Sequence, residues 1–84
     1  MLVRIESLKE LETFIFLLER DGRIDNSESS LSRSYDIRSI FNHKTGSTYS
    51  LTMRSNGKYD VLTNLEHYGK AISFLEFFKL QRNN

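Results

Sequence analysis

The spacing of apolar residues changes once along the chain, from a helical repeat to alternation. Up to residue 18, apolar side chains recur every three or four residues, which is typical of one face of a helix. From residue 35 to residue 62, apolar and polar residues alternate, which is typical of strands with one buried face. The two patterns together predict an α+β fold in which helices cover one face of an antiparallel sheet.

The first helix is marked at both ends. Ser7 followed by Glu10 fits a capping box, in which each side chain accepts a hydrogen bond from the other residue's backbone N–H. Gly22 can adopt the left-handed conformation that ends a helix. The apolar stripe between them consists of Leu8, Leu11, Phe14, Ile15 and Leu18. Residues 2–5, just before the cap, are a candidate fourth strand.

The alternating region predicts a three-stranded antiparallel meander over residues 35–42, 48–54 and 58–62. One face of this sheet is apolar and is expected to pack beneath an N-terminal and a C-terminal helix. The other face is mostly polar. On that polar face Ile40 and Leu62 are expected to flank Ser50 in one cross-strand row.

The register follows from the length of the turns. A three-residue loop at 55–57 pairs Met53 with Tyr59 and keeps one sheet face apolar. A two-residue loop would pair Met53 with Asp60 and mix the faces, because a one-residue slip turns every side chain to the other side. The same argument predicts a three-residue hairpin loop at 44–46, and both loops end in glycine, which suits a left-handed third position.

A second helix is expected to begin after Thr63 or Asn64, where Glu66 completes a capping box with Thr63. Its apolar stripe consists of Leu65, Tyr68, Ala71, Ile72, Leu75 and Phe78. Between the first helix and the sheet, residues 21–34 are polar and Ser-rich and predict a flexible surface loop. With 84 residues, positions 1–84 form a single small domain.

The composition excludes several classes of protein. The chain has no cysteine, so disulfides, thiolate catalysis and Cys-ligated metal sites are excluded. The longest apolar run, Phe14–Leu18, is too short to span a bilayer. No signal peptide is visible at the N-terminus, where charge appears at once. These features predict a cytoplasmic protein without a membrane partner.

Residues that could carry chemistry are scattered. His43 and His67 lie in different predicted elements, and the four glycines form no phosphate-binding loop. Residues 17–28 overlap partly with a calcium-binding loop, but Leu17 occupies the first ligand position and cannot coordinate. We therefore expect no catalytic residue, no cofactor, no metal site and no small-molecule substrate. An enzyme would require a site that a second subunit completes.

A basic surface supports one alternative function. Arg38, Arg54 and Lys58 are expected on the solvent face of the sheet, and Lys44 on a hairpin loop. A three-stranded sheet followed by a helix is similar to the arm-type DNA-binding domains of phage integrases. That likeness in topology implies a DNA-binding module that uses these four residues, or an acidic partner on the same face. The face lacks aromatic residues, which argues against stacking of single-stranded nucleic acid.

An excess of apolar residues on the two helices supports the preferred hypothesis. Several side chains lie beside or away from the predicted core stripes, and these are Phe16, Leu17, Phe74, Phe77 and Leu80. Exposed together, they would form a surface for a protein partner or for a second copy of the chain. Deeper packing of the helices is the other explanation. We expect a non-catalytic interaction protein, a regulator or inhibitor of the kind that phages and mobile elements often encode.

Overall fold

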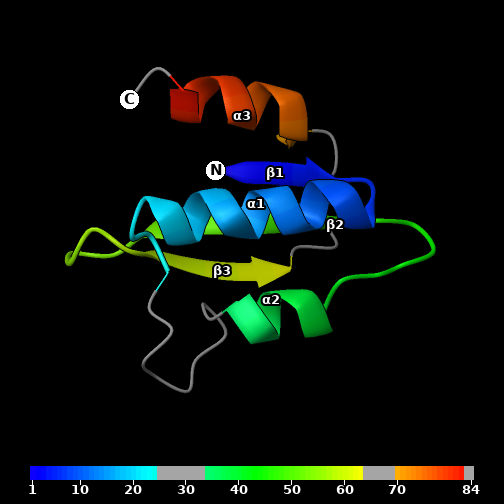
Figure 1. Cartoon of the computed structure of the whole chain (residues 1–84), viewed down its shortest axis with the longest axis horizontal. Helices are drawn as coiled ribbons and strands as arrows, with labels where there is room; N and C mark the ends of the chain where they lie inside the picture. Colours follow the sequence, from blue (N-terminus) through cyan, green and yellow to red (C-terminus); the bar gives the residue numbers. More distant parts are fainter. Residues whose placement is uncertain (25–33, 64–69, 83–84) are drawn as a thin grey trace.

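The computed structural model describes residues 1–24, 34–63 and 70–82, which form a four-stranded sheet and three helices (Figure 1). The α+β fold predicted from the sequence is confirmed. In chain order the elements are β1 (Leu2–Ile5), α1 (Leu8–Arg20), α2 (Ser34–Ser39), β2 (Ser47–Met53), β3 (Tyr59–Thr63), β4 (Ile72–Ser73) and α3 (Phe74–Arg82).

The strands lie in the order β3-β2-β1-β4, so the first strand of the sequence is in the interior of the sheet. The candidate fourth strand at residues 2–5 is confirmed as β1. It pairs antiparallel with β2, where Val3 lies opposite Tyr49, and parallel with β4, where Val3 lies opposite Ile72. The sheet is therefore mostly antiparallel, with one parallel pair at its edge.

The hairpin between β2 and β3 has the predicted register. Met53 lies opposite Tyr59, and Leu51 lies opposite Val61. The backbone N–H of Arg54 donates to the carbonyl of Lys58 (2.7 Å), which closes the three-residue loop. Gly57 adopts a positive φ of 83°, as the third position of such a loop requires.

The prediction of a strand at residues 35–42 is wrong, because residues 34–39 form the short helix α2. Ile37 and Phe41 are buried, and their spacing of four residues suits a helical turn as well as alternating positions of a strand. Tyr35 is 71% exposed, although the strand would have buried it. The 44–46 hairpin is also absent. Residues 42–46 instead form a turn before β2, in which Gly46 has a φ of 78°.

The second predicted helix begins later than expected. Thr63 belongs to β3, and β4 at Ile72–Ser73 occupies part of the predicted helix. Ser73 caps α3, because its Oγ accepts a hydrogen bond from the Glu76 N–H (3.1 Å). The predicted cap at Asn64 and Glu66 and the stripe residues Leu65 and Tyr68 lie outside the described residues. Most of the predicted flexible loop, residues 25–33, also lies outside them.

Helix α1 has the predicted ends, with one difference at its start. The Glu10 N–H donates to Ser7 Oγ (3.2 Å), while the Glu10 carboxylate accepts from the Glu6 N–H (2.9 Å) rather than from Ser7. At the other end Gly22 has a φ of 66°, and the Arg23 N–H donates to the Leu18 carbonyl (2.8 Å).

The core lies between one sheet face and the helices. The sheet contributes Val3, Ile5, Tyr49, Leu51 and Val61, all at most 3% exposed. Helix α1 packs over them, and its Phe14 ring meets the Phe77 ring of α3 edge to face at 5.2 Å. The Tyr49 hydroxyl donates to the Ile37 carbonyl (2.8 Å), which attaches α2 to the sheet. Burial raises the pKa of this hydroxyl.

Candidate functional site

The sheet face opposite the core carries an apolar row. Leu2 lies opposite Ser50 on β2, and Ser50 lies opposite Leu62 on β3. Leu2 is half-buried, and Leu62 is 47% exposed. We call Leu2, Ser50 and Leu62 the open-face row. The helices within residues 1–24, 34–63 and 70–82 pack their buried side chains against the other face of the sheet.

The open-face row was predicted in part. Leu62 and Ser50 lie as expected, but Ile40 does not join them, because it follows α2 and packs against the core. Leu2 of β1 takes the place predicted for Ile40. The register of β2 and β3 could be read from the turn, whereas the position of β1 beside β2 could not.

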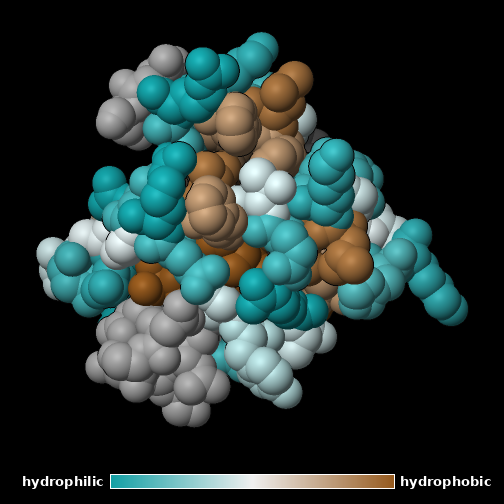
Figure 2. Space-filling model, viewed as in Figure 1, coloured by the Kyte–Doolittle hydropathy of each residue, from teal (hydrophilic) through white to brown (hydrophobic). Residues whose placement is uncertain are grey.

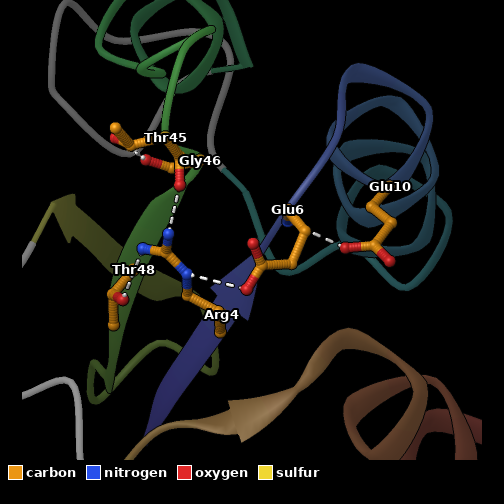
Figure 3. A network of polar contacts seen from close by, with 6 residues as sticks. All are labelled: Arg4, Glu6, Glu10, Thr45, Gly46 and Thr48. Carbon is orange, nitrogen blue, oxygen red and sulfur yellow. Dashed lines mark hydrogen bonds and ion pairs between the residues drawn. The ribbon is translucent and has the colours of Figure 1, made fainter.

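An arginine network lies at one end of the same face (Figure 3). Arg4 Nε lies 3.0 Å from Glu6 Oε1, and its Nη1 donates to Thr48 Oγ1 (3.3 Å). Its Nη2 donates to the backbone carbonyl of Thr45. The guanidinium therefore ties β1 to β2 and to the turn before it, and Thr48 is fully buried beneath it.

A pocket of about 380 Å³ adjoins this network. It lies where β1 leads into α1 and where the parallel strand β4 leads into α3. Its lining consists of Arg4, Glu6, Glu10, Ala71, Ser73, Phe74, Leu75 and Glu76. Three carboxylates and one guanidinium give the pocket an acidic balance, and the start of α3 gives it an apolar wall.

The predicted apolar contact residues divide into two groups. Phe16 is 60% exposed and Leu80 is 46% exposed, as predicted. Leu17 and Phe77 are core residues, at 4% and 0% exposure, so their predicted place on the surface is wrong. Phe77 is buried because α3 leans on α1, and the Phe14 ring meets it there.

The other residues of α3 complete this picture. Phe74 is half-buried, and its ring lies 6.3 Å from that of Phe78. Leu75 was predicted in the core stripe, but it is 61% exposed because the helix begins at Phe74 and presents a different face. Apolar side chains reach the surface over α3 and between α3 and α1 (Figure 2).

The predicted basic surface is not assembled. Arg38 is on α2 rather than on the sheet, and its guanidinium donates to both carboxylate oxygens of Glu12 (2.8 Å for the shorter bonds). Hydrogen bonding by Arg38 lowers the pKa of Glu12. Arg54 Nε lies 3.7 Å from a carboxylate oxygen of Asp60. Of the residues predicted for the solvent face of the sheet, Arg38 therefore lies elsewhere, whereas Arg54 and Lys58 flank the turn between β2 and β3.

The remaining basic residues occupy turns at two places. Lys58 is in the β2–β3 turn, where its N–H donates to Asn56 Oδ1 (3.0 Å). Lys44 is in the turn before β2, where its N–H donates to Asn42 Oδ1 (2.9 Å). Because β2 runs between these turns, the two lysines lie at opposite ends of that strand.

Of the two histidines, His43 is exposed, and its ring meets that of Phe41 edge to face at 5.2 Å. His67 lies outside the described residues, as does the end of the partial calcium loop. Within the described part of the chain, no group of three His, Asp or Glu residues could hold a metal ion. No helix in that part is long and apolar enough to cross a membrane.

Sequence reasoning missed the pocket, although one signal for it was present. Ser73 and Glu76 have the spacing of a capping box, and they mark the true start of α3. Because the predicted helix began after residue 63 or 64, Ser73 and Glu76 fell in its interior and were not interpreted as a helix start. No comparable signal indicated that β4 would lie beside β1.

Comparison with known proteins gives one match. A family model described as PmbA/TldA metallopeptidase domain 1 matches residues 3–65, which include β1, α1, α2, β2 and β3. Neither a curated protein nor a solved structure matches the chain. The matched residues contain Ser50 and Leu62 of the open-face row but not Leu2, whereas β4 and α3 follow them.

Proposed function

We propose that the chain, which belongs to the PmbA/TldA metallopeptidase domain 1 family, works by docking onto another protein rather than by catalysis. The docking would regulate or inhibit that partner. The family description names a metallopeptidase, so the catalytic part of such an enzyme is the first partner to test.

The open-face row carries this proposal. Leu62 on the edge strand β3 exposes 47% of its surface on a mostly polar sheet face, with half-buried Leu2 in the same row. An isolated exposed leucine is ordinary, but here two leucines lie in one row across three strands, on either side of the small side chain of Ser50. Apolar strips with polar surroundings are typical of the centre of a protein interface.

The polar groups around the row fit such an interface. Ser50 lies between the two leucines, and Thr52 and Asp60 lie opposite each other one step further along β2 and β3. Their side chains are short and place polar groups beside the leucines. On the other side of the row, Arg4 and Thr48 lie opposite each other on β1 and β2 and contribute polar groups.

The experiment measures binding of the 84-residue chain to the catalytic part of a PmbA/TldA metallopeptidase by isothermal titration calorimetry. Leu62→Asp should weaken binding by about tenfold or more, because a carboxylate would be desolvated at the centre of the interface. Leu8→Asp is the matched control, since Leu8 on α1 is 53% exposed but lies away from the open face.

Three results would count against the proposal. These are the absence of a complex, equal weakening by Leu62→Asp and Leu8→Asp, and peptide hydrolysis by the chain alone. Thermal unfolding monitored by circular dichroism verifies that both variants are folded before binding is compared.

A further inference from the structure

The pocket beside Arg4 combines an apolar wall with an acidic rim. Ala71, Phe74 and Leu75 contribute apolar surface, and Leu75 is 61% exposed there. Glu10 and Glu76 contribute carboxylates from the first turns of α1 and α3. At about 380 Å³ the pocket is at the lower end of the range for binding sites, which suits one side chain better than a folded segment.

The charge of Arg4 is already used within the chain. Its guanidinium contacts Glu6, Thr45 and Thr48, as Figure 3 shows. Glu6 balances Arg4 at 3.0 Å, so Glu10 and Glu76 supply the remaining negative charge of the pocket. This balance favours a cation and disfavours a phosphate or carboxylate ligand.

Each of these two carboxylates has one oxygen engaged in capping. Glu10 Oε1 accepts from the Glu6 N–H (2.9 Å), and Glu76 Oε1 lies 3.4 Å from Ser73 Oγ. Within the described part of the chain, the Oε2 atoms of both residues make no hydrogen bond. The capping contacts fix the positions of the carboxylates while leaving acceptor oxygens for a ligand.

We propose that this pocket binds an arginine side chain of a partner polypeptide. The alkyl stem packs on Phe74 and Leu75, and the guanidinium donates to Glu10 and Glu76. Arginine fits better than lysine, because its planar group presents several donors that can engage two carboxylates at once. A long cationic side chain also matches a pocket with an apolar wall and an acidic rim.

This inference rests on the proposed function and adds the chemistry of a contact residue. It concerns a different surface from the open-face row. The pocket draws most of its lining from residues 71–76, which follow the part of the chain that the family model matches. Arginine recognition would therefore distinguish this chain from other proteins that match the same family model.

The test titrates the isotopically labelled 84-residue chain with blocked pentapeptides that carry arginine, lysine or leucine between pairs of glycines. Amide shifts in the ¹⁵N–¹H spectrum report the site and the dissociation constant. The arginine peptide should shift the amides of Glu6, Glu10 and Ser73–Glu76, with a millimolar dissociation constant that rises with salt. The lysine peptide should bind more weakly, and the leucine peptide should cause no localised shifts.

Glu10→Gln combined with Glu76→Gln should raise the dissociation constant of the arginine peptide by about fivefold or more. Glutamine retains an acceptor oxygen, so both helix caps persist. Asp21→Asn combined with Asp60→Asn is the matched control, because it changes the net charge equally but lies outside the pocket.

Two outcomes would overturn the inference. One is equal binding of the three peptides, and the other is equal weakening by the pocket and control variants. Either result leaves the open-face test unaffected, because that test uses Leu62 and the whole partner. Conversely, loss of the partner complex with intact arginine binding would refute only the open-face docking.

Discussion

The ion pair between Glu12 and Arg38 joins α1 to α2 at the surface. Hydrogen bonds from Arg38 lower the pKa of the Glu12 carboxyl group in the folded protein. A folded-state pKa below the unfolded value adds stability at pH values above the unfolded pKa. That contribution disappears as the pH falls through the lowered pKa, because the carboxyl group then takes up a proton and loses its charge.

Glu12→Gln should therefore reduce the free energy of unfolding at neutral pH by about 0.2–1 kcal/mol, the range for exposed ion pairs. The difference between wild type and variant should vanish in acid. Urea unfolding at about pH 7 and about pH 3 measures this, since an ordinary glutamate titrates between these values. A difference that is equal at both pH values would contradict the electrostatic explanation.

At the scale of elements, Gly46 links the turn before β2 to the end of β1. A Cβ at this position would lie 2.5 Å from the Ile5 carbonyl oxygen, and the φ of 78° is strained for any other residue. Gly22 has a similar φ of 66°, but a Cβ there would meet nothing within 4 Å. Substituting Gly22 therefore tests backbone strain alone, whereas substituting Gly46 tests strain together with a steric clash.

Gly46→Ala should lower the free energy of unfolding by about 2 kcal/mol or more, since strain and a backbone clash add together. Gly22→Ala should lower the free energy of unfolding by about 1 kcal/mol, because only backbone strain is added there. Chemical denaturation of both variants gives the comparison. Equal losses would mean that the turn moves away from β1 without cost.

The elements that could be predicted are those with two agreeing local signals. Helix α1 has a stripe and two caps, and the β2–β3 hairpin has alternation and a turn of fixed length. Residues 35–42 have only alternation, and the buried pair Ile37 and Phe41 suits helix and strand alike. The hydrogen bond from the Tyr49 hydroxyl to the Ile37 carbonyl holds α2 against the sheet, and such a contact between distant residues leaves no local pattern in the sequence.

The same limit applies to the candidate site. The row at Ser50 and Leu62 follows from the hairpin register, so sequence could indicate it. The pocket requires β4 to lie parallel to β1, which joins residues 4–10 to residues 71–76. Two paired residues are too short a strand to leave a pattern in the sequence.

At the scale of the whole molecule, Phe77 attaches α3 to the rest of the fold. Its side chain is fully buried and meets the Phe14 ring, whereas Leu80 on the same helix is 46% exposed. Phe74 and Phe78 of α3 are partly buried against the core, so Phe77 supplies the most deeply buried contact of this helix.

Phe77→Ala should lower the free energy of unfolding by about 3–5 kcal/mol, a large share of what a small domain has. Leu80→Ala should cost less than about 1 kcal/mol. Hydrogen exchange should show lost protection across α3 in the Phe77 variant before β2 and β3 are affected. Uniform loss across all elements would show instead that α3 is required for the whole sheet.

The interior position of β1 has a consequence for biosynthesis. The ribosome makes β1 before its two neighbours in the sheet, β2 and β4. Until they are made, β1 has no native strand to bond with at either edge, and unpaired strand edges are prone to aggregation. Closing the sheet around a strand from the opposite end of the chain is a non-local event, and it should make folding slow for a protein of this size.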